Sequence, residues 1–215
     1  MVDLLNQVEV RVLGALIEKA ITTPDNYPLS LNALTNACNQ SSNRDPVVRY
    51  DDQTVADAID TLRRGNLVHI VHRSDSRVTR YRQVVDETWG LDSAATAVMD
   101  VLMLRGSQTV GEVRTRSMRL HDFRGLDEVE STLNALIARE PDGFVSRLPR
   151  QTGQKEVRYV HRLGGEVTPE SAASEDPDLP DPGERLARLE DTTGELRDQL
   201  EELQKQFEQF RKQFE

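Results

Sequence analysis

The sequence predicts a mainly α-helical fold with small β hairpins, because one pattern of residues occurs twice and a heptad repeat follows it. Residues 53–85 and residues 127–163 each read as an amphipathic helix, a short strand, a polar turn and a second strand. A helix that leads into a two-stranded basic hairpin is the second half of a winged helix-turn-helix unit. We therefore predict two tandem winged helix-turn-helix domains followed by a C-terminal coiled-coil helix. The expected boundaries are residues 1–90 and 91–165 for the two domains, 166–183 for a flexible acidic linker and 184–215 for the coiled-coil helix.

The third helix of each copy is predicted by matching apolar stripes. Val55, Ile59 and Leu62 are spaced by four and three residues, which places them on one face of a helix. The second copy repeats these steps with an equivalent set: Val129, Leu133 and Leu136. Because a hairpin is not stable alone, each one needs these helices to pack against.

The helices in front of these stripes follow from the same spacing. A wide apolar face covers about residues 4–21, and its members are Leu5, Val8, Val12, Leu13, Leu16, Ile17 and Ala20. Ser30 is placed to cap a short helix whose inward residues are Leu31, Leu34 and Cys38. In the second copy the first helix is marked by Ala94, Val98, Val101 and Leu102. Thr109 and Glu112 then form a capping box that opens the second helix.

The C-terminal part of the chain changes pattern twice. Residues 166–183 have no apolar periodicity and are rich in Pro, Gly, Ser and acidic residues, which is typical of a flexible linker. Beyond this stretch, a seam of residues is spaced alternately by three and four positions, and Thr193 is its one polar member. The apolar members are Leu186, Leu189, Leu196, Leu200, Leu203, Phe207, Phe210 and Phe214. So narrow a seam favours a coiled coil over a single helix docked on the body. We expect a homo-oligomer, with a dimer favoured, although the glutamines beside the seam leave the number and orientation of strands open.

The net charge of −10 belongs to the tail. Residues 1–165 hold 21 Lys and Arg against 22 Asp and Glu, whereas residues 166–215 hold 6 against 15. The two predicted domains are therefore close to neutral, and the acidity of the whole chain does not argue against an anionic partner.

Several function classes have no support in the sequence. There is no apolar run of roughly 20 residues and no signal segment, so we expect a cytoplasmic protein without a membrane partner. His69 and His72 fall in a predicted strand, where a spacing of three residues places them on opposite faces, so we expect no metal. There is no glycine-rich phosphate loop and no catalytic triad, so we expect no cofactor and no enzyme. Cys38 is expected to be a buried structural thiol, and Trp89 to pack the two copies together.

Duplex DNA is the partner suggested by the hairpins. Basic residues lie on or beside each hairpin or at the end of the helix before it: Arg64, Arg73, Arg77, Arg80 and Arg82 in the first copy, and Arg147, Arg150, Lys155 and Arg158 in the second. Such side chains suit phosphate contacts, which give affinity without reading sequence. The alternative is that any solvated hairpin carries charge. The third helix of the first copy also exposes Asp57 and Asp60, and the exposed face of the third helix in the second copy is flanked by Glu128 and Glu130. The charge of these acids has the wrong sign for the major groove.

One stretch outside the repeat carries a family resemblance. The residues Tyr27, Leu29–Leu34, Ala37–Gln40, Ser42–Arg44 and Pro46–Val47 resemble the signature of the YceH-like family of uncharacterised bacterial proteins. The resemblance covers about Leu4 to Leu163, and it implies a tandem winged-helix fold with no established activity. The loop residues Asn39, Gln40, Ser42, Asn43 and Arg44 could contact a ligand or partner, or could tie the loop to its own backbone. We favour the second interpretation; Arg44 is the strongest candidate if the loop binds anything.

Two functions remain open from the sequence. The first is a non-enzymatic, DNA-associated regulator that binds duplex DNA mainly through its basic wings. The second is a protein–protein interaction scaffold that uses its winged helices and coiled coil without DNA. The arginine-rich hairpins favour the regulator, and the acidic faces of both third helices favour the scaffold. We rank the regulator first because DNA binding is the commonest use of this fold.

Overall fold

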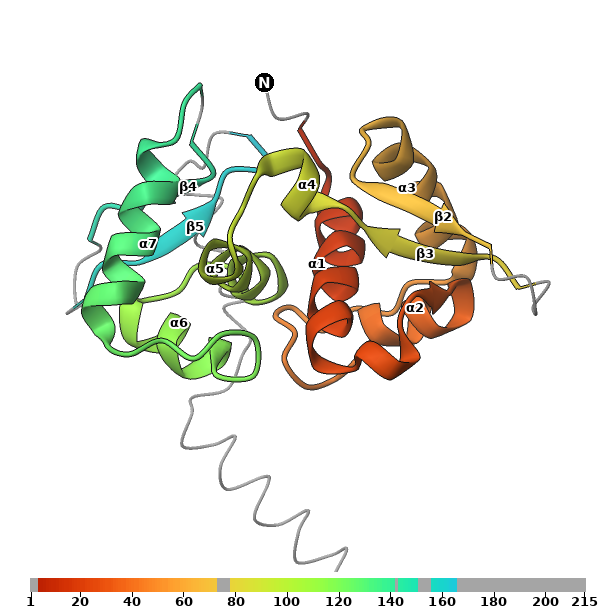
Figure 1. Ribbon diagram of the computed structural model, residues 1–215, viewed down its shortest axis with the longest axis horizontal. Helices are drawn as coiled ribbons and strands as arrows, with labels where there is room; N and C mark the ends of the chain where they lie inside the picture. The colour runs from red at the N-terminus through yellow and green to blue at the C-terminus, as the bar shows by residue number, and fades with distance from the viewer. Residues whose placement is uncertain (1–3, 73–77, 142, 151–155, 166–215) are drawn as a thin grey trace, which may run out of the picture. The chain divides into compact units, whose positions relative to one another are not determined.

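The computed structural model describes residues 4–72, 78–141, 143–150 and 156–165 (Figure 1). These residues all belong to the first of two compact units into which the chain divides, Met1–Ala172 and Ala173–Glu215. The predicted linker and coiled-coil helix, with all the heptad residues, lie outside the described residues. So do three of the predicted DNA contacts: Arg73, Arg77 and Lys155.

The first half of the described unit is three helices and a small sheet. Its elements in chain order are α1 (Gln7–Thr22), η1 (Pro24–Asn26), β1 (Leu29–Ser30), α2 (Leu31–Cys38), α3 (Asp52–Arg64), β2 (Val68–Val71) and β3 (Arg80–Gln83). The sheet is antiparallel with β3 in the centre, in the order β1-β3-β2. Ser30 caps α2 as predicted. Helix α1 begins at Gln7 rather than near residue 4, because Asn6 and Glu9 form a capping box there.

The second half repeats this order. A short helix, α4 (Val85–Trp89), leads into α5 (Ser93–Arg105), α6 (Val110–Ser117), α7 (Leu126–Ala138), β4 (Val145–Arg147) and β5 (Tyr159–His161). Strands β4 and β5 pair antiparallel, and Gln108 bridges to Tyr159 on the other side of β5. Gln108 thus takes the place that β1 has in the first half. The predicted capping box between Thr109 and Glu112 is present at the start of α6.

The predicted apolar stripes are confirmed as core. Val55, Ile59 and Leu62 on α3 are buried, and so are their counterparts on α7, Val129, Leu133 and Leu136. The expected fold class is thereby confirmed at the level of a mainly helical chain with small antiparallel sheets. No helix in the described part of the chain has the length and apolarity needed to cross a bilayer.

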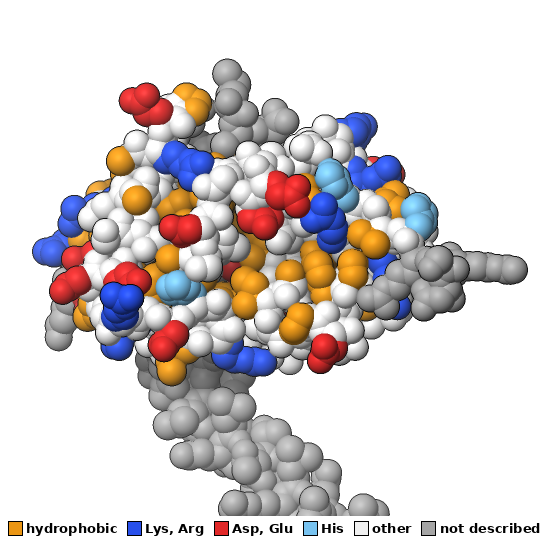
Figure 2. All heavy atoms as spheres, in the orientation of Figure 1, with side chains coloured by type: hydrophobic (Ala, Val, Ile, Leu, Met, Phe, Trp, Pro, Cys, Tyr) orange, Lys and Arg blue, Asp and Glu red, His pale blue; other side chains and the backbone are white. Residues whose placement is uncertain are grey.

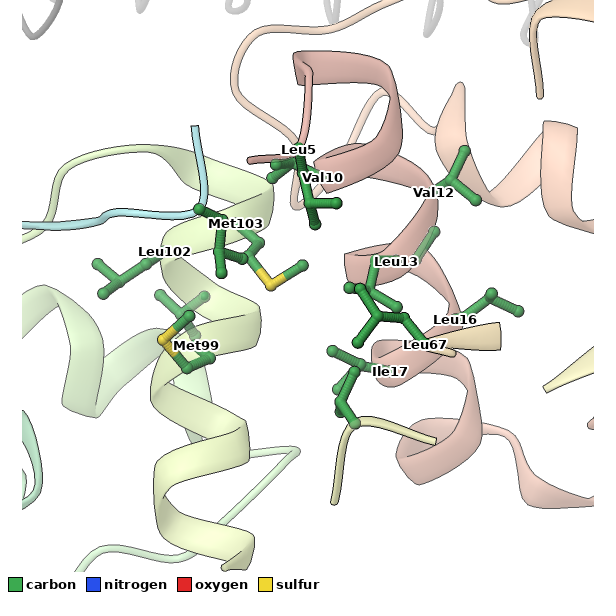
Figure 3. Close-up of a cluster of buried hydrophobic side chains, with 14 of the residues drawn as sticks. Leu5, Val10, Val12, Leu13, Leu16, Ile17, Leu67, Met99, Leu102 and Met103 are labelled. Carbon is green, nitrogen blue, oxygen red and sulfur yellow. The ribbon is translucent and has the colours of Figure 1, made fainter. Parts of the chain in front are cut away.

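Helices α1 and α5 lie side by side at the centre of the unit and join the two halves into one core. Leu13 and Ile17 on α1 and Met103 on α5 reach into the space between the two helices (Figure 3). The helices can approach closely because α1 has a glycine at this point. A Cβ atom built on Gly14 would lie 2.9 Å from Cδ2 of Leu104.

Further contacts fasten the halves together at other points. The Leu5 amide donates to the Leu163 carbonyl at 2.7 Å, and the Asp45 amide donates to the Leu104 carbonyl at 2.9 Å. Trp89 is buried, and its ring lies 5.3 Å from that of Phe144 between centroids. This ring contact holds α4, the segment between the two copies, against the second half. Contact of Trp89 with the first half stays a prediction.

Candidate nucleic-acid interface

A shallow hollow lies where α3 turns into β2. Its volume is about 560 Å³, and it is lined by Asp60, Arg63, Arg64, Asn66, Val68, His69 and Ile70. Lys, Arg and His side chains gather over the β2–β3 end of the molecule in Figure 2. This hollow brings together Arg64 and His69, which the sequence places at the end of the helix and on the hairpin, with Arg63, a basic side chain that the sequence did not single out for DNA binding.

The turn after α3 positions these groups. Asp51 caps the start of the helix by accepting the Thr54 amide at 2.7 Å, and the helix ends at Arg64. Asn66 adopts a φ of 54°, a left-handed conformation that asparagine tolerates better than most residues. The chain therefore reverses within a few residues, and the last turn of α3 lies beside His69, whose Nε2 is 2.9 Å from Oδ1 of Asn66.

The charges around the hollow are mixed. Arg63 pairs with Asp60 at 3.1 Å, with both side chains largely exposed. Arg64 donates to the neutral hydroxyl of Thr61 at 3.0 Å, so its charge is not compensated by that contact. Asp57, one turn earlier on the same exposed side, accepts from Gln53 at 2.8 Å. Arg64 is therefore the cation of α3 best placed to meet an anion.

The two described arginines on β3 already have partners. Arg80 is half-buried, and its Nη1 donates to the Pro28 carbonyl at 2.8 Å, which ties β3 to the segment before β1. Arg82 pairs with Glu87 at 3.1 Å. Arg80 thus has a structural contact that its position on a predicted hairpin did not suggest.

The second half carries a different set of arginines. Arg147 and Arg150 are exposed, and neither side chain has a hydrogen bond or ion pair with another described residue. Arg158 is engaged: its Nη1 donates to the Ser107 carbonyl at 2.8 Å and lies 3.2 Å from a carboxylate oxygen of Glu112. The exposed side of α7 carries the small or neutral residues Ser131, Asn134 and Ala135, and the exposed acids Asp127 and Glu130 precede them on the same helix.

The loop after α2 is braced from within by Arg44. This side chain is fully buried, and it donates to the Ala37 carbonyl at 2.8 and 3.1 Å, to the Asn43 carbonyl at 2.9 Å and to the Glu18 carboxylate at 2.7 and 3.2 Å. The guanidinium group therefore joins α1, α2 and the loop. Burial raises the pKa of Glu18, but the hydrogen bonds and charge of Arg44, helped by Lys19, outweigh burial and leave this pKa below its ordinary value.

The other family-signature residues of the loop divide between bracing contacts and exposed surface. The side chain of Asn39 bonds the backbone of Tyr50 twice, accepting its amide at 2.8 Å and donating to its carbonyl at 2.7 Å. Gln40 accepts from Lys19 at 3.2 Å, and Asn43 accepts from Arg105 of α5. Ser42 is exposed. The contacts of Asn39, Gln40, Asn43 and Arg44 hold the loop in place, which supports the interpretation favoured from the sequence.

Buried charged residues on the central helices α1 and α5 were missed by sequence reasoning, and Arg11, Glu18 and Asp100 are the ones that bear on this region. Arg11 donates to the carbonyls of Cys38 at 3.3 Å and Pro46 at 2.7 Å, while Glu18 pairs with Arg44. Asp100 on α5 is 2% exposed. The available signal was the position of each charge within an otherwise apolar helix, but spacing alone does not show what such a charge would meet.

Cys38 and the histidines give no sign of reactive chemistry. Cys38 is buried and free, and burial raises the pKa of its thiol to about 12, so the thiol stays protonated. Within the described ranges, no three His, Cys, Asp or Glu side chains come together in a way that could hold a metal ion.

Comparisons with known proteins add one consistent result. The family model described as "Protein of unknown function, DUF480" matches residues 5–154. The chain is 50% identical over 193 residues to a UPF0502 protein of Opitutus terrae, covering 90% of this chain and 83% of the relative. It is 51% identical over 173 residues to a UPF0502 protein of Geotalea daltonii, covering 80% and 78% of the two chains. A UPF0502 protein of Vibrio parahaemolyticus is 43% identical over 197 residues, covering 90% and 91%.

Proposed function

This chain belongs to the DUF480 or UPF0502 family of uncharacterised bacterial proteins, and we propose that it is a DNA-associated regulator built from two winged helix-turn-helix domains. The domains are residues 1–90 and 91–165. Each binds duplex DNA mainly through basic side chains on the backbone phosphates, without enzymatic chemistry.

The repeated order of elements supports the winged-helix assignment. In the first half α2 and α3 follow α1, and a hairpin follows α3, with β1 completing a sheet in the order β1-β3-β2. The second half has the same order, and the Gln108 bridge replaces β1. In winged helix-turn-helix proteins, the helix that corresponds to α3 meets the major groove and the hairpin lies along the backbone.

The hollow between α3 and β2 is the observation that carries the DNA proposal. It places Arg63, Arg64 and His69 on one surface at the junction of a recognition helix and its wing. Arg147 and Arg150 give the second domain exposed cations of its own. Guanidinium groups bind phosphate oxygens through two parallel hydrogen bonds, and such contacts position a protein on a duplex without reading bases.

The acidic side chains on α3 set the limits of this binding. Asp57 and Asp60 are exposed on the helix that would enter the groove, and carboxylates are repelled by phosphates. The exposed side of α7 also lacks the Arg and Gln side chains that commonly read base edges, although Asn134 is present. We therefore propose wing-led binding with weak sequence preference.

A salt titration of the full-length protein against a mixed-sequence duplex tests the proposal. Contact with about five phosphates gives a salt slope near −4.5, so affinity falls on the order of several hundredfold between about 50 and 200 mM salt. Replacing Arg147 and Arg150 together by Ala should reduce the magnitude of the slope by up to about 1.8. Arg49→Ala is the matched control, because it removes an exposed arginine outside the hollow and the hairpins. If the intact protein does not bind duplex DNA at low salt, the regulator proposal is wrong.

The second candidate function is a protein-binding scaffold. Met118 after α6 and Leu126 at the start of α7 are 71% and 48% exposed, and both flank the helix that would otherwise read DNA. Exposed apolar side chains beside an acid-bearing helix suit a protein partner better than a phosphate backbone. Absence of DNA binding together with capture of a defined protein that is lost in Met118→Ser would support this candidate.

Assembly through the C-terminal heptads is part of the same proposal. The seam residues from Leu186 to Phe214 repeat in steps of three and four, as in two-stranded coiled coils. Replacing Leu200 and Leu203 by Glu places charges in that seam. The full-length protein should then change from dimer to monomer by light scattering. An unchanged mass would show that these heptads do not drive self-association.

A further inference from the structure

Asp100 is a buried carboxyl group for which the DNA proposal has no use. It lies in the middle of α5, the helix that packs against α1, and it is 2% exposed. Its Oδ1 atom is buried and has no hydrogen-bond partner among the described residues. A carboxyl oxygen without a partner in a protein interior is costly when it is charged, because nothing replaces the water that it loses.

The groups that face Asp100 do not supply a dedicated counter-ion. Glu18 and Lys19 approach from α1, and Arg44 approaches from the loop after α2. The Arg44 guanidinium is already bonded to Glu18 at 2.7 Å, and Lys19 lies 3.1 Å from the same carboxylate. An ionised Asp100 would compete with Glu18 for these cations, at the point where the two halves of the unit meet.

Both burial and Glu18 favour the neutral form of Asp100. Burial is the larger effect and the negative charge of the Glu18 side chain adds to it, so the pKa of Asp100 is raised well above the ordinary value of 3.8. Arg44, Lys19 and a hydrogen bond with the Glu18 backbone act in the opposite direction. Asp100 therefore keeps its proton at pH values where an exposed aspartate has lost it. Glu18 keeps its charge in the same cluster because it holds the hydrogen bonds from Arg44.

We propose that Asp100 is a proton-binding site that couples pH to the packing of α1 against α5. With the proton bound, the neutral acid fits between the helices and the two halves stay closely packed. When the proton leaves, the carboxylate is repelled by Glu18 and draws on Arg44, so the junction loosens. The loop held by Arg44 is affected at the same time, because its Asp45 amide is bonded to the Leu104 carbonyl one turn after Asp100.

The direction of the pH effect follows from proton linkage. The folded protein holds the Asp100 proton more tightly than the unfolded chain does, because the folded pKa is raised. The stabilising contribution of Asp100 is therefore complete below the unfolded value of 3.8 and declines as pH rises through the folded pKa. The lowered pKa of Glu18 acts in the opposite sense, since its contribution is present above 4.5 and is lost as pH falls. A comparison with Asp100→Asn separates the two effects.

The first test measures thermal unfolding of the full-length protein between pH 5 and pH 9. Asp100→Asn keeps the size of the side chain and removes the ionisation. The melting temperature of the variant should increase relative to that of the wild type as pH rises. The expected increase is on the order of 3 °C for each tenfold shift in the folding equilibrium. Asp92→Asn is the matched control on the same helix, because Asp92 caps α5 from an exposed position and Asn caps equally well. If plots of melting temperature against pH for the wild type and Asp100→Asn stay parallel over this range, the proposal is overturned.

The second test follows the junction directly. Hydrogen exchange of the Asp45 amide, corrected for its intrinsic pH dependence, should lose protection by up to about tenfold for each pH unit above the pKa of Asp100. Asp100→Asn should abolish this loss, and the amide of Ile59 inside α3 should not show it. The carboxyl ¹³C resonance that disappears in Asp100→Asn reports the titration itself. A titration midpoint near 4, or constant Asp45 protection across the measured midpoint, would refute the coupling.

Discussion

The two halves of the described unit share one order of elements, yet the connections between the second and third helices of each half are stabilised differently. The connection between α2 and α3 in the first half, residues 39–51, contains the buried guanidinium of Arg44 with its bonds to α1 and α2. The corresponding connection in the second half, residues 118–125, is shorter, and none of its basic residues is buried. The repeated apolar stripes therefore build each half. Arg44, which has no buried counterpart in residues 118–125, fixes the loop whose neighbours Asn43 and Asp45 bond to α5.

The surfaces of the two halves differ in a related way. The exposed side of α3 carries Asp57 and Asp60 in its middle and Arg63 and Arg64 at its C-terminal end, so it bears both signs of charge. Helix α7 carries the acidic residues Asp127, Glu128 and Glu130 in its first turns, neutral residues after them and no basic residue. The exposed cations of its half lie on other elements, for example Arg114 on α6 and Arg147 on β4. A duplicated fold has thus been given two unlike surfaces, which indicates that the copies do not make identical contacts.

Removal of Arg44 is expected to cause the largest loss of unfolding free energy among these substitutions. Arg44→Ala leaves Glu18 and the Ala37 carbonyl without their main partner in the interior. Loss of one partner of a buried ion pair costs about 3–5 kcal/mol in unfolding free energy. Urea denaturation should show this decrease, with Arg44→Lys intermediate because a lysine keeps the charge but not the planar set of donors.

Arg49→Ala is the control for this substitution, since it removes an exposed arginine from the same loop. Its effect should stay within about 0.5 kcal/mol. If Arg44→Ala were as mild as Arg49→Ala, the buried network would not be what distinguishes the first half.

Two glycines allow the junction to be compared with an ordinary helix surface. Gly14→Ala places a Cβ atom 2.9 Å from Cδ2 and 3.0 Å from Cγ of Leu104, a buried side chain on α5. Overpacking costs about 1–3 kcal/mol, which exceeds the gain of about 1 kcal/mol from better helix propensity. Gly111→Ala on α6 meets nothing closer than 4.0 Å, so it should stabilise the protein by up to about 1 kcal/mol. If denaturation showed that both substitutions change the unfolding free energy in the same direction, α1 and α5 would not be closely packed at Gly14.

The smallest expected effect concerns the charges on the two proposed recognition helices. Asp57→Asn removes a repulsive carboxylate from α3, and Ser131→Asp adds one at an exposed position on α7. An exposed charge contributes little, so the first change should strengthen duplex binding by about two- to fivefold and the second should weaken it to a similar extent. Fluorescence anisotropy at low salt measures both changes. If neither substitution alters binding, these helices do not face the DNA.

Sequence reasoning could predict the parts of the fold that depend on periodicity and capping. The stripes on α3 and α7 and the Thr109–Glu112 box were found because each is a local pattern with one dominant physical cause. The start of α1 was predicted about three residues too early. Leu4 and Leu5 continue the apolar pattern, but the Asn6 cap sets the first helical residue at Gln7.

The candidate site could be predicted less well, because a side chain's partners depend on contacts between distant segments. Arg80 was expected on the surface of a wing, but the pairing of β3 with β1 brings its guanidinium to the Pro28 carbonyl. The network of Glu18, Arg44 and Asp100 depends on three segments that are far apart in the chain, and no local spacing announces it. Arg63 and His69 come together because Asn66 reverses the chain between them.

The hydrogen bond between the Leu5 amide and the Leu163 carbonyl has a consequence for folding during synthesis. Leu5 is synthesised roughly 160 residues before its partner carbonyl on Leu163 and the nearby strand β5. At about 5–20 residues per second, this interval is on the order of ten seconds or more. During that time α1 can pack with α2 and α3, but its face toward α5 and its N-terminal end stay uncovered. A nascent chain of this protein therefore carries an exposed apolar helix face through much of its synthesis, and that face is where a ribosome-associated chaperone would meet it.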